Sequence, residues 1–209
     1  MFVQELIYPC GTAVLVWQLM EDGPQLLALC REKGIPVDDL MDLPVKRQRE
    51  KSVERLLLCR AFGHGVSLLH DEQGAPLIQG HEGVNISITH TPQLVALAWH
   101  GQHVIGLDAE QCDRGQVLRV RDRFLNTDEQ QFIDPGDLDA HVIAWTVKEA
   151  IIKAERNSAI NWTDGICLEP FDWHADDIVV VARCGGHGYS LSSRLVQGHY
   201  ITVASPQDE

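Results

Sequence analysis

The sequence of 209 residues has little positive charge. Lys and Arg number 17 against 30 Asp and Glu, which gives a formal net charge of −13 at pH 7. A chain of this charge repels other polyanions, which argues against non-specific binding to nucleic acid or to an anionic membrane. Any anionic ligand must therefore be held by a local basic patch.

Segments that direct a chain to a membrane are also missing. An acidic residue, Glu5, lies where a signal peptide carries positive charge, and Pro9 and Gln18 interrupt the apolar run over residues 6–20. No stretch is long enough and apolar enough to span a bilayer. We therefore expect a cytoplasmic protein with no membrane partner.

The six cysteines form no Cys-x-x-Cys pair, and most of them lie in apolar strings such as residues 56–59. This usage favours reduced, buried thiols over disulfides or metal ligands. Low-complexity linkers and internal repeats are absent as well. Hydrophobic residues make up 44% of the chain and charged residues 22%, as in a packed globular protein. The sequence thus predicts one continuous globule, built as one large domain or two small halves.

Local patterns predict mixed secondary structure in the first half of the chain. An apolar, β-branched strand is expected over 12–19, and helices over 25–33 and 46–62, ended by Gly34 and Gly63. Residues 84–90, 94–99 and 104–110 then alternate or run apolar between turn signals. We predict that these three segments form an antiparallel meander.

The second half begins with helical signals. Thr127 is a candidate N-cap, and Asp137 precedes a periodic stretch over 142–155. Strands are expected over 178–183, 189–195 and 200–204. The order of elements predicts an α+β protein with antiparallel sheets rather than a doubly wound one.

Two carboxylates stand out on the strand over 104–110. Asp108 and Glu110 are two residues apart, so both project from the same face of the strand. Adjacent like charges favour a cation between them, and Mg²⁺ prefers oxygen ligands of this kind. A solvated strand end without a ligand is the alternative.

Three further patterns carry charge or chemistry. Glu149 and Lys153 are spaced for a helical ion pair, which is either a surface pair or part of a site beside the apolar residues around them. His90 ends a strand of alternating hydroxyl residues, and it is either a phosphate donor or an ordinary hydrogen-bonded histidine. The helix over 46–60 carries six basic residues against two acidic ones, which favours either polyanion binding or a solvated face.

Taken together, these signals are more specific than any one alone. The order Thr89-His90-Thr91, Gly106 to Glu110, Phe124 to Glu129 and Trp145 to Lys153 resembles the 4′-phosphopantetheinyl transferase superfamily, in particular its longer single-chain, pseudodimeric class. The resemblance covers about residues 47–153. It implies a fold of two similar α+β halves, here residues 1–103 and 104–209, related by a pseudo-twofold axis. The active site would lie in the cleft between the halves.

The resemblance also implies an activity and its residues. A monomeric enzyme would transfer the 4′-phosphopantetheine arm of coenzyme A to a serine of an acyl or peptidyl carrier protein, with Mg²⁺ as cofactor and 3′,5′-ADP released. Asp108, Glu110 and Glu149 would hold the metal, and Glu149 and Lys153 would be catalytic. Coenzyme A would be bound by Thr89, His90, Arg47, Lys51 and Arg60. The alternatives are a Mg²⁺-dependent phosphohydrolase and a non-catalytic coenzyme A-binding protein.

One departure concerns coenzyme A, and one segment concerns the carrier. The family commonly has Gly-Lys-Pro where this chain has Gly74-Ala75-Pro76, so a lysine contact to phosphate is missing.

Four arginines over 114–123, followed by Phe124 and Leu125, predict a basic helix with an apolar end that could meet an acidic carrier, or else a solvated helix face. The pathway served by the carrier is left open.

Overall fold

The computed structural model describes residues 3–207, and the outermost residues of the two predicted halves lie outside this range. The first part of the chain forms β1 (Val3–Ile7), β2 (Ala13–Gln18), α1 (Gly23–Glu32), α2 (Val45–Phe62), β3 (Leu68–His70), β4 (Pro76–Ile78), β5 (Asn85–Thr91) and β6 (Leu94–His100). The rest forms β7 (Gly106–Gln111), α3 (Gln116–Arg119), α4 (Glu129–Phe132), α5 (Leu138–Glu155), β8 (Ile166–Leu168), β9 (Ile178–Cys184), β10 (His187–Val196) and β11 (His199–Pro206). Single 3₁₀ turns lie at Asp38–Leu40 and Arg121–Arg123.

The strands form two main antiparallel sheets and one short hairpin. The first sheet has the order β1-β2-β6-β5 and the second has the order β7-β11-β10-β9-β8, while β3 pairs only with β4. Every strand pair is antiparallel. The predicted α+β class with antiparallel sheets is therefore confirmed. The chain thus builds one sheet before residue 104 and the other after it.

The predicted meander is correct for only two of its three strands. β5 and β6 form a hairpin, but β7 leaves that sheet and pairs with β11, so that Asp108 lies opposite Thr202. The reason is that both edges of β6 are already occupied, by β2 and by β5. The alternation of apolar and polar residues determines which face of a strand each side chain is on, but it does not determine which strand pairs with it.

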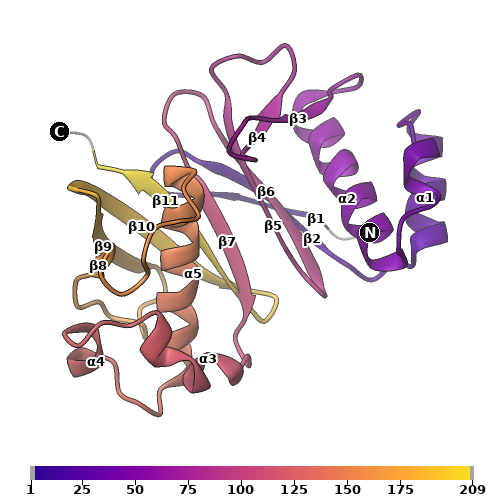
Figure 1. The fold of residues 1–209 in the computed structure, drawn as a ribbon. Helices are drawn as coiled ribbons and strands as arrows, with labels where there is room; N and C mark the ends of the chain where they lie inside the picture. The colour runs from indigo at the N-terminus through magenta and orange to yellow at the C-terminus, as the bar shows by residue number, and fades with distance from the viewer. Residues whose placement is uncertain (1–2, 208–209) are drawn as a thin grey trace.

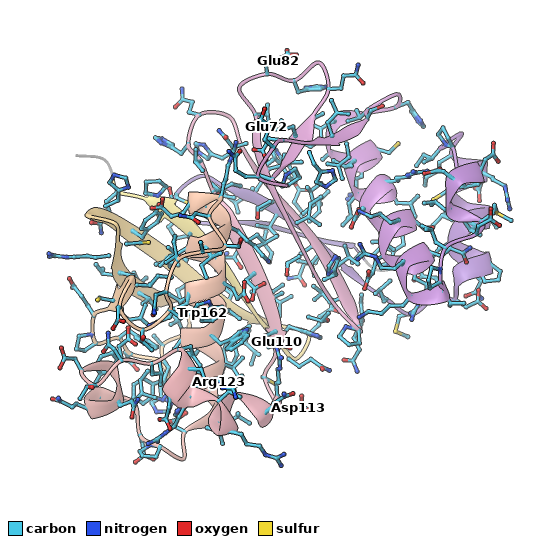
Figure 2. All side chains as sticks on the ribbon, viewed as in Figure 1. Glu72, Glu82, Glu110, Asp113, Arg123 and Trp162 are labelled. Carbon is cyan, nitrogen blue, oxygen red and sulfur yellow. The ribbon has the colours of Figure 1, made fainter. Side chains whose placement is uncertain are left out.

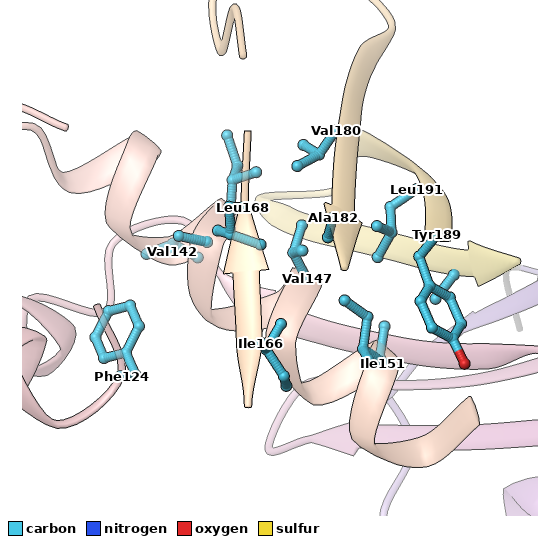
Figure 3. Packing of buried hydrophobic residues seen from close by; sticks show 14 of the residues in the cluster. Phe124, Val142, Val147, Ile151, Ile166, Leu168, Val180, Ala182, Tyr189 and Leu191 are labelled. Carbon is cyan, nitrogen blue, oxygen red and sulfur yellow. The ribbon is translucent and has the colours of Figure 1, made fainter. Parts of the chain in front are cut away.

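Each sheet has one face covered by helices. α1 and α2 lie side by side over the first sheet, where Leu57 of α2 packs with Leu15 and Leu97 of the strands (Figure 1). α5 covers the second sheet, and its Val147 and Ile151 pack with residues of β9 and β10 (Figure 3). The apolar spacing of α5 therefore serves to bury this face.

The other faces of the two sheets meet in a third buried cluster. Val16 and Ala96 of the first sheet pack with Leu107 and Ile201 of the second, and all four side chains are at most 1% exposed. Alternation along β7 therefore directs Leu107 and Ala109 into this cluster and leaves Asp108 and Glu110 on the face toward α5. The predicted common face of the two carboxylates is confirmed.

Helix ends agree with the sequence at Gly63 and Asp137 and differ at a third position. Gly63 follows α2 with a φ of +89°, and Asp137 caps α5 by accepting a hydrogen bond from the Ala140 N–H at 3.0 Å. The predicted N-cap at Thr127 is wrong. Asn126 and Glu129 instead form a reciprocal pair, in which each side chain accepts the other's backbone N–H at 2.9 Å. At this three-residue spacing, the asparagine and glutamate side chains together satisfy the backbone N–H groups of both residues.

The expectation of buried thiols is wrong for most of the cysteines. Only Cys30 and Cys184 are buried, and Cys10 and Cys167 are exposed. Cys167 lies on β8 between the buried Ile166 and Leu168 and faces the opposite side, whereas Cys59 lies on α2 and Cys10 and Cys112 lie in turns. Within residues 3–207, none of the helices is both long and apolar enough to cross a bilayer.

Candidate active site

The candidate site lies where β5, β7 and α5 meet. A cavity of about 380 Å³ is lined by Ile88, Thr89, His90, Asp108, Ala109, Glu110, Arg114, Trp145, Glu149 and Lys153. Two strands from different sheets and one helix therefore supply a single polar cavity. The structure brings together six of the residues predicted from the sequence.

Asp108 is at the centre of this group. Its Oδ1 accepts hydrogen bonds from Thr89 Oγ1 at 3.0 Å and from Lys153 Nζ at 2.7 Å. Lys153 also donates to the Leu107 carbonyl at 2.9 Å. The spacing suggested Glu149 as the partner of Lys153, but this lysine reaches across to β7 and forms its ion pair with Asp108. The side chain of Lys153 thus ties α5 to the strand of the carboxylates.

Glu110 is held by a cation of its own. Its Oε2 forms an ion pair with Arg114 four residues further on, and its Oε1 accepts the Gln111 N–H at 2.9 Å. Figure 2 shows Glu110 on the stretch of β7 that leads toward α3 and Arg123. The guanidinium of Arg114 also lies over the ring of Trp145, 5.3 Å from its centroid. Arg114 was not predicted as the partner of Glu110.

Glu149 is in an environment that disfavours its charged form. Burial raises the pKa of the Glu149 carboxyl above its ordinary value, and the Asp108 carboxylate raises it further. Lys153 and Arg114 act in the opposite direction and compensate in part. A carboxyl with a raised pKa, in a cavity with a second carboxylate and a lysine, is typical of sites that move protons.

His90 and Thr89 lie on β5 with their side chains on opposite faces. Thr89 is buried against Asp108, whereas His90 is 37% exposed in its side chain, with Nε2 4.0 Å from Glu54 Oε1 of α2. The hydroxyls of β5 thus face the second sheet, where Ser87 also accepts the Leu107 N–H at 2.9 Å. This strand supplies the cavity wall from the first half.

The three basic residues predicted on α2 lie outside this cavity. Arg47 pairs with Glu50, and Lys51 pairs with Glu54 at 2.6 Å. Lys51 lines another cavity, of about 720 Å³, beside α2. Arg60 is exposed near the end of the helix. Because Glu54 contacts both Lys51 and His90, it links the basic helix to the carboxylate cavity.

Arg156 lies beside the turn that lacks the lysine. Asp71 Oδ1 accepts the Ala75 N–H at 2.8 Å, and Asp71 Oδ2 lies 3.2 Å from the guanidinium of Arg156 at the end of α5. Arg156 was not predicted as a site residue. It follows Lys153 by three residues, and this spacing places the two residues on the same side of the helix. The spacing was the only indication in the sequence that Arg156 lies near the site.

The basic segment after β7 differs from its prediction. It forms only the short helix α3 and one 3₁₀ turn, and the expected apolar end, Phe124 and Leu125, is buried at 1% exposure. A long apolar helix end is thus not presented to a partner. A cavity of about 330 Å³ lies there, lined in part by Phe124, Trp145 and Trp162.

A buried ion pair supports the helix that carries the site. Lys148, with no exposed side-chain surface, donates to Glu129 at 2.7 Å and to the carbonyls of Trp162 and Ile166. Glu129 in turn accepts the Leu168 N–H at 2.8 Å. The motif glutamate after Phe124 therefore holds α5 to α4 and β8 and lies away from the cavity.

Comparison with known families identifies the second half of the chain. Residues 104–204, from just before β7 into β11, match the family model described as the 4′-phosphopantetheinyl transferase superfamily. This stretch is a 4′-phosphopantetheinyl transferase superfamily domain. It contains Asp108, Glu110, Glu149 and Lys153, whereas Thr89 and His90 precede the matched residues. A comparison with curated proteins finds no match to the chain.

Proposed function

We propose that the protein transfers the 4′-phosphopantetheine arm of coenzyme A to a serine of an acyl or peptidyl carrier protein. One observation carries the proposal. The acidic residues and the lysine of the phosphopantetheinyl transferase superfamily domain line one cavity, and β5 adds a hydroxyl and an imidazole to it. A polar cavity with both signs of charge suits a highly anionic pyrophosphate.

The donor chemistry of the cavity fits Mg²⁺. Asp108, Glu110 and Glu149 would hold the ion, since carboxylate oxygens are its preferred ligands. Among residues 3–207, no three Asp, Glu, His or Cys side chains already surround one point as metal ligands would. Two of the three carboxylates form ion pairs, Asp108 with Lys153 and Glu110 with Arg114. When bound, the metal would supply positive charge beside the pyrophosphate oxygens.

The reaction needs one base and one stabilised leaving group. The serine oxygen of the carrier forms a bond to the phosphorus that bears the pantetheine, and the bond from this phosphorus to the oxygen of 3′,5′-ADP breaks. Ionised Glu149 is the proposed acceptor of the serine proton. Its raised pKa makes it a stronger base than an ordinary glutamate.

Lys153 is proposed to act on the departing oxygen. Its Nζ is already held by the Leu107 carbonyl and Asp108, so its position is fixed before substrate arrives. A positioned ammonium stabilises the negative charge that develops as 3′,5′-ADP leaves. His90, half-exposed beside the cavity, is proposed to donate to a phosphate oxygen, and Thr89 to keep Asp108 oriented.

The adenosine phosphates are proposed to lie toward α2, where Arg47, Lys51 and Arg60 supply positive charge. The link from Lys51 through Glu54 to His90 supports this direction. Arg156 is the proposed substitute for the lysine absent at Ala75, because its guanidinium contacts the same turn through Asp71. Arginine binds phosphate in a bidentate geometry, so Arg156 would supply the positive charge that the absent lysine supplies in the family.

The carrier is proposed to dock over the basic segment. Arg123 lines the cavity of Phe124, Trp145 and Trp162, and Arg119 and Arg121 belong to the same short segment after β7. Local positive charge is necessary because both the protein and a typical carrier are acidic overall. The carrier would then be recognised by charge complementarity, without a contribution from an apolar helix end.

The architecture is proposed to be that of the single-chain, pseudodimeric class, acting as a cytoplasmic monomer. The proposed halves are 1–103 and 104–209, related by a pseudo-twofold axis, with coenzyme A between them. Support comes from the pairing of one antiparallel sheet with one 18-residue helix in each half, α2 and α5. The cavity draws its lining from both halves, as a cleft of this kind requires.

Mass spectrometry of apo-carriers tests the activity. The protein is incubated with coenzyme A, Mg²⁺ and a panel of apo-carrier proteins, and a gain equal to one phosphopantetheine arm on a serine is the expected result. A parallel incubation without carrier separates a phosphohydrolase, which would release 3′,5′-ADP from coenzyme A with water. Tight binding of coenzyme A with neither product would instead point to a non-catalytic binding protein.

A further inference from the structure

Arg114 occupies a position that no part of the reaction explains. It lies in the turn after β7, where its backbone N–H donates to the Gln111 carbonyl at 3.1 Å. Its side chain is 35% exposed and turns back onto Glu110, whose carboxylate is only 12% exposed. The arginine therefore neutralises a shielded carboxylate inside the cavity.

The same side chain belongs to two cavities at once. Arg114 lines the carboxylate cavity and also the neighbouring cavity of Phe124, Trp145 and Trp162. Its guanidinium lies between the two cavities, over the Trp145 ring. The ring centroids of Trp145 and Trp162 are 4.6 Å apart. An arginine stacked on an aromatic face can slide along it and keep part of this attraction.

We propose that Arg114 is a positioning residue that competes with the divalent cation for Glu110 and moves toward the aromatic cavity when the cation binds. The inference rests on the proposed assignment of Glu110 to the metal. One Glu110 oxygen accepts the Gln111 N–H, and the other is held by Arg114. A cation that takes the second oxygen must displace the guanidinium.

The competition has a physical basis in charge. A divalent cation and a guanidinium on the same carboxylate repel each other, and the repulsion is weakly screened in a partly buried cavity. Lys153 differs because its Nζ also donates to the Leu107 carbonyl, which keeps it on β7. Arg114 has the aromatic cavity beside it as an alternative position. The Arg114 guanidinium thus neutralises the Glu110 carboxylate until the metal arrives.

The first test measures metal binding alone, without coenzyme A or carrier. Mn²⁺ is titrated into wild type, R114Q and R114K, and the free ion is followed by electron paramagnetic resonance. The R114Q variant is expected to bind Mn²⁺ about threefold more tightly, because the cation then no longer has to break the ion pair of Arg114 with Glu110. R114K keeps the charge and should stay nearer to wild type.

A matched control and the contrary outcome make the test decisive. R119Q removes the same charge from an exposed position at the end of α3 and should leave Mn²⁺ affinity within the error of wild type. Equal or weaker Mn²⁺ binding by R114Q, or no binding by any of the four proteins, overturns the inference. Circular dichroism melts of all four proteins establish that each is folded.

The second test follows the movement. Mg²⁺ is titrated while tryptophan fluorescence is recorded, and wild type should show a saturable change because the Arg114 guanidinium shifts over the Trp145 ring toward the aromatic cavity. R114Q should lose this change although it binds metal. A change of equal size in R114Q contradicts the movement.

The inference and the proposed function can fail separately. If wild type modifies apo-carriers but R114Q shows unchanged Mn²⁺ affinity, the competition is wrong and the transferase assignment stands. If no carrier is modified but R114Q binds Mn²⁺ more tightly, the competition stands and the assignment of the reaction is wrong.

Discussion

At the scale of single residues, the carboxylates of the cavity differ in their surroundings. Asp108 is held by Thr89 and Lys153 and Glu110 by Arg114, whereas the main influence on Glu149 is burial, which raises the pKa of its carboxyl. The three carboxylates therefore have three different environments. The substitutions below separate their roles.

The first prediction concerns Asp108. Asp108→Ala removes one ligand charge and leaves Lys153 without its carboxylate, so transfer at ordinary Mg²⁺ should fall by at least about 100-fold, equal to about 3 kcal/mol in the transition state. Glu110→Ala should cost less, because water can replace one ligand. Activity is measured by carrier modification against Asp113→Ala, an exposed acidic residue in the loop after β7. Near-wild-type turnover by folded Asp108→Ala would remove this residue from the metal site.

The second prediction concerns Glu149 and Lys153. Glu149→Gln keeps the shape of the side chain and removes its basicity, so kcat should fall by at least about 100-fold, the range usual for a lost acid or base. Lys153→Ala should have a similar effect on kcat. Unchanged turnover with a slightly lowered melting temperature would return both residues to a structural role.

Stability gives an independent measure of Glu149. A carboxyl whose pKa is raised in the folded state is destabilised when ionised, and this destabilisation is relieved as pH falls through the raised value. In a chelating buffer, Glu149→Gln should therefore melt above wild type near neutral pH. The difference should shrink as the pH is lowered, because folded wild type then binds a proton that the unfolded chain does not yet bind. Melting temperatures that decrease in the variant at neutral pH would contradict the burial argument.

At the scale of secondary-structure elements, the site depends on how closely α5 approaches β7. Gly106 makes this approach possible, since a Cβ there would overlap the Ala150 carbonyl oxygen. The glycine before Asp108 in the sequence therefore has a packing reason. The other support is the ion pair of Lys148 and Glu129 on the opposite side of the helix.

The third prediction tests that ion pair. Lys148→Met leaves the Glu129 charge buried without a cation, so the free energy of unfolding should drop by roughly 3–5 kcal/mol. Adding Glu129→Gln to this variant should cost less than the sum of the two single substitutions, because the uncompensated charge is removed. Urea denaturation of the four proteins gives the cycle. Additive losses would show that the two side chains stabilise the fold independently.

The fourth prediction concerns the basic residues of α2. Arg47→Glu with Lys51→Glu should raise the KM for coenzyme A more than the KM for carrier, because the adenosine phosphates lose their positive surroundings. Adding Arg60→Glu should extend the effect. Lys46→Glu, with a side chain 74% exposed on the same helix, is the matched control. If coenzyme A and dephospho-coenzyme A keep the same relative affinity in variants and wild type, the 3′-phosphate is bound elsewhere.

At the scale of the whole molecule, the two sheets share a buried interface. Within the same cluster, the Tyr8 hydroxyl donates a hydrogen bond to the Ile201 carbonyl at 2.9 Å, and Arg194 lies over the Tyr8 ring, 4.9 Å from its centroid. Burial raises the pKa of the Tyr8 hydroxyl well above its ordinary value. The cavity lies across the boundary between the sheets, so its geometry requires both.

The fifth prediction follows from this shared interface. The protein should unfold in one cooperative transition, because separation of the sheets would expose the cluster of Val16, Leu107 and Ile201 to water. Denaturation followed by far-ultraviolet circular dichroism and by tryptophan fluorescence should give coincident midpoints. Ile201→Ala should lower stability by about 2–5 kcal/mol without splitting the transition. Two separate midpoints in wild type would show that the halves fold independently.

The sequence by itself determined the features that depend on near neighbours. Alternation placed Asp108 and Glu110 on one face of β7, and apolar spacing predicted the long helices α2 and α5. The motif order predicted a superfamily that the family model supports over residues 104–204. These features are accessible because strand alternation and helical periodicity are local.

Only the tertiary structure decided which distant residues meet. β7 joins β11 and not β6, and Lys153 pairs with a carboxylate 45 positions earlier rather than with its neighbour on the helix. Arg114 offered no sequence signal for Glu110 beyond its proximity, and Phe124 is buried where an exposed helix end was expected. Such partners depend on which sheet edge is open and which faces pack, and a residue's own sequence neighbours do not set these.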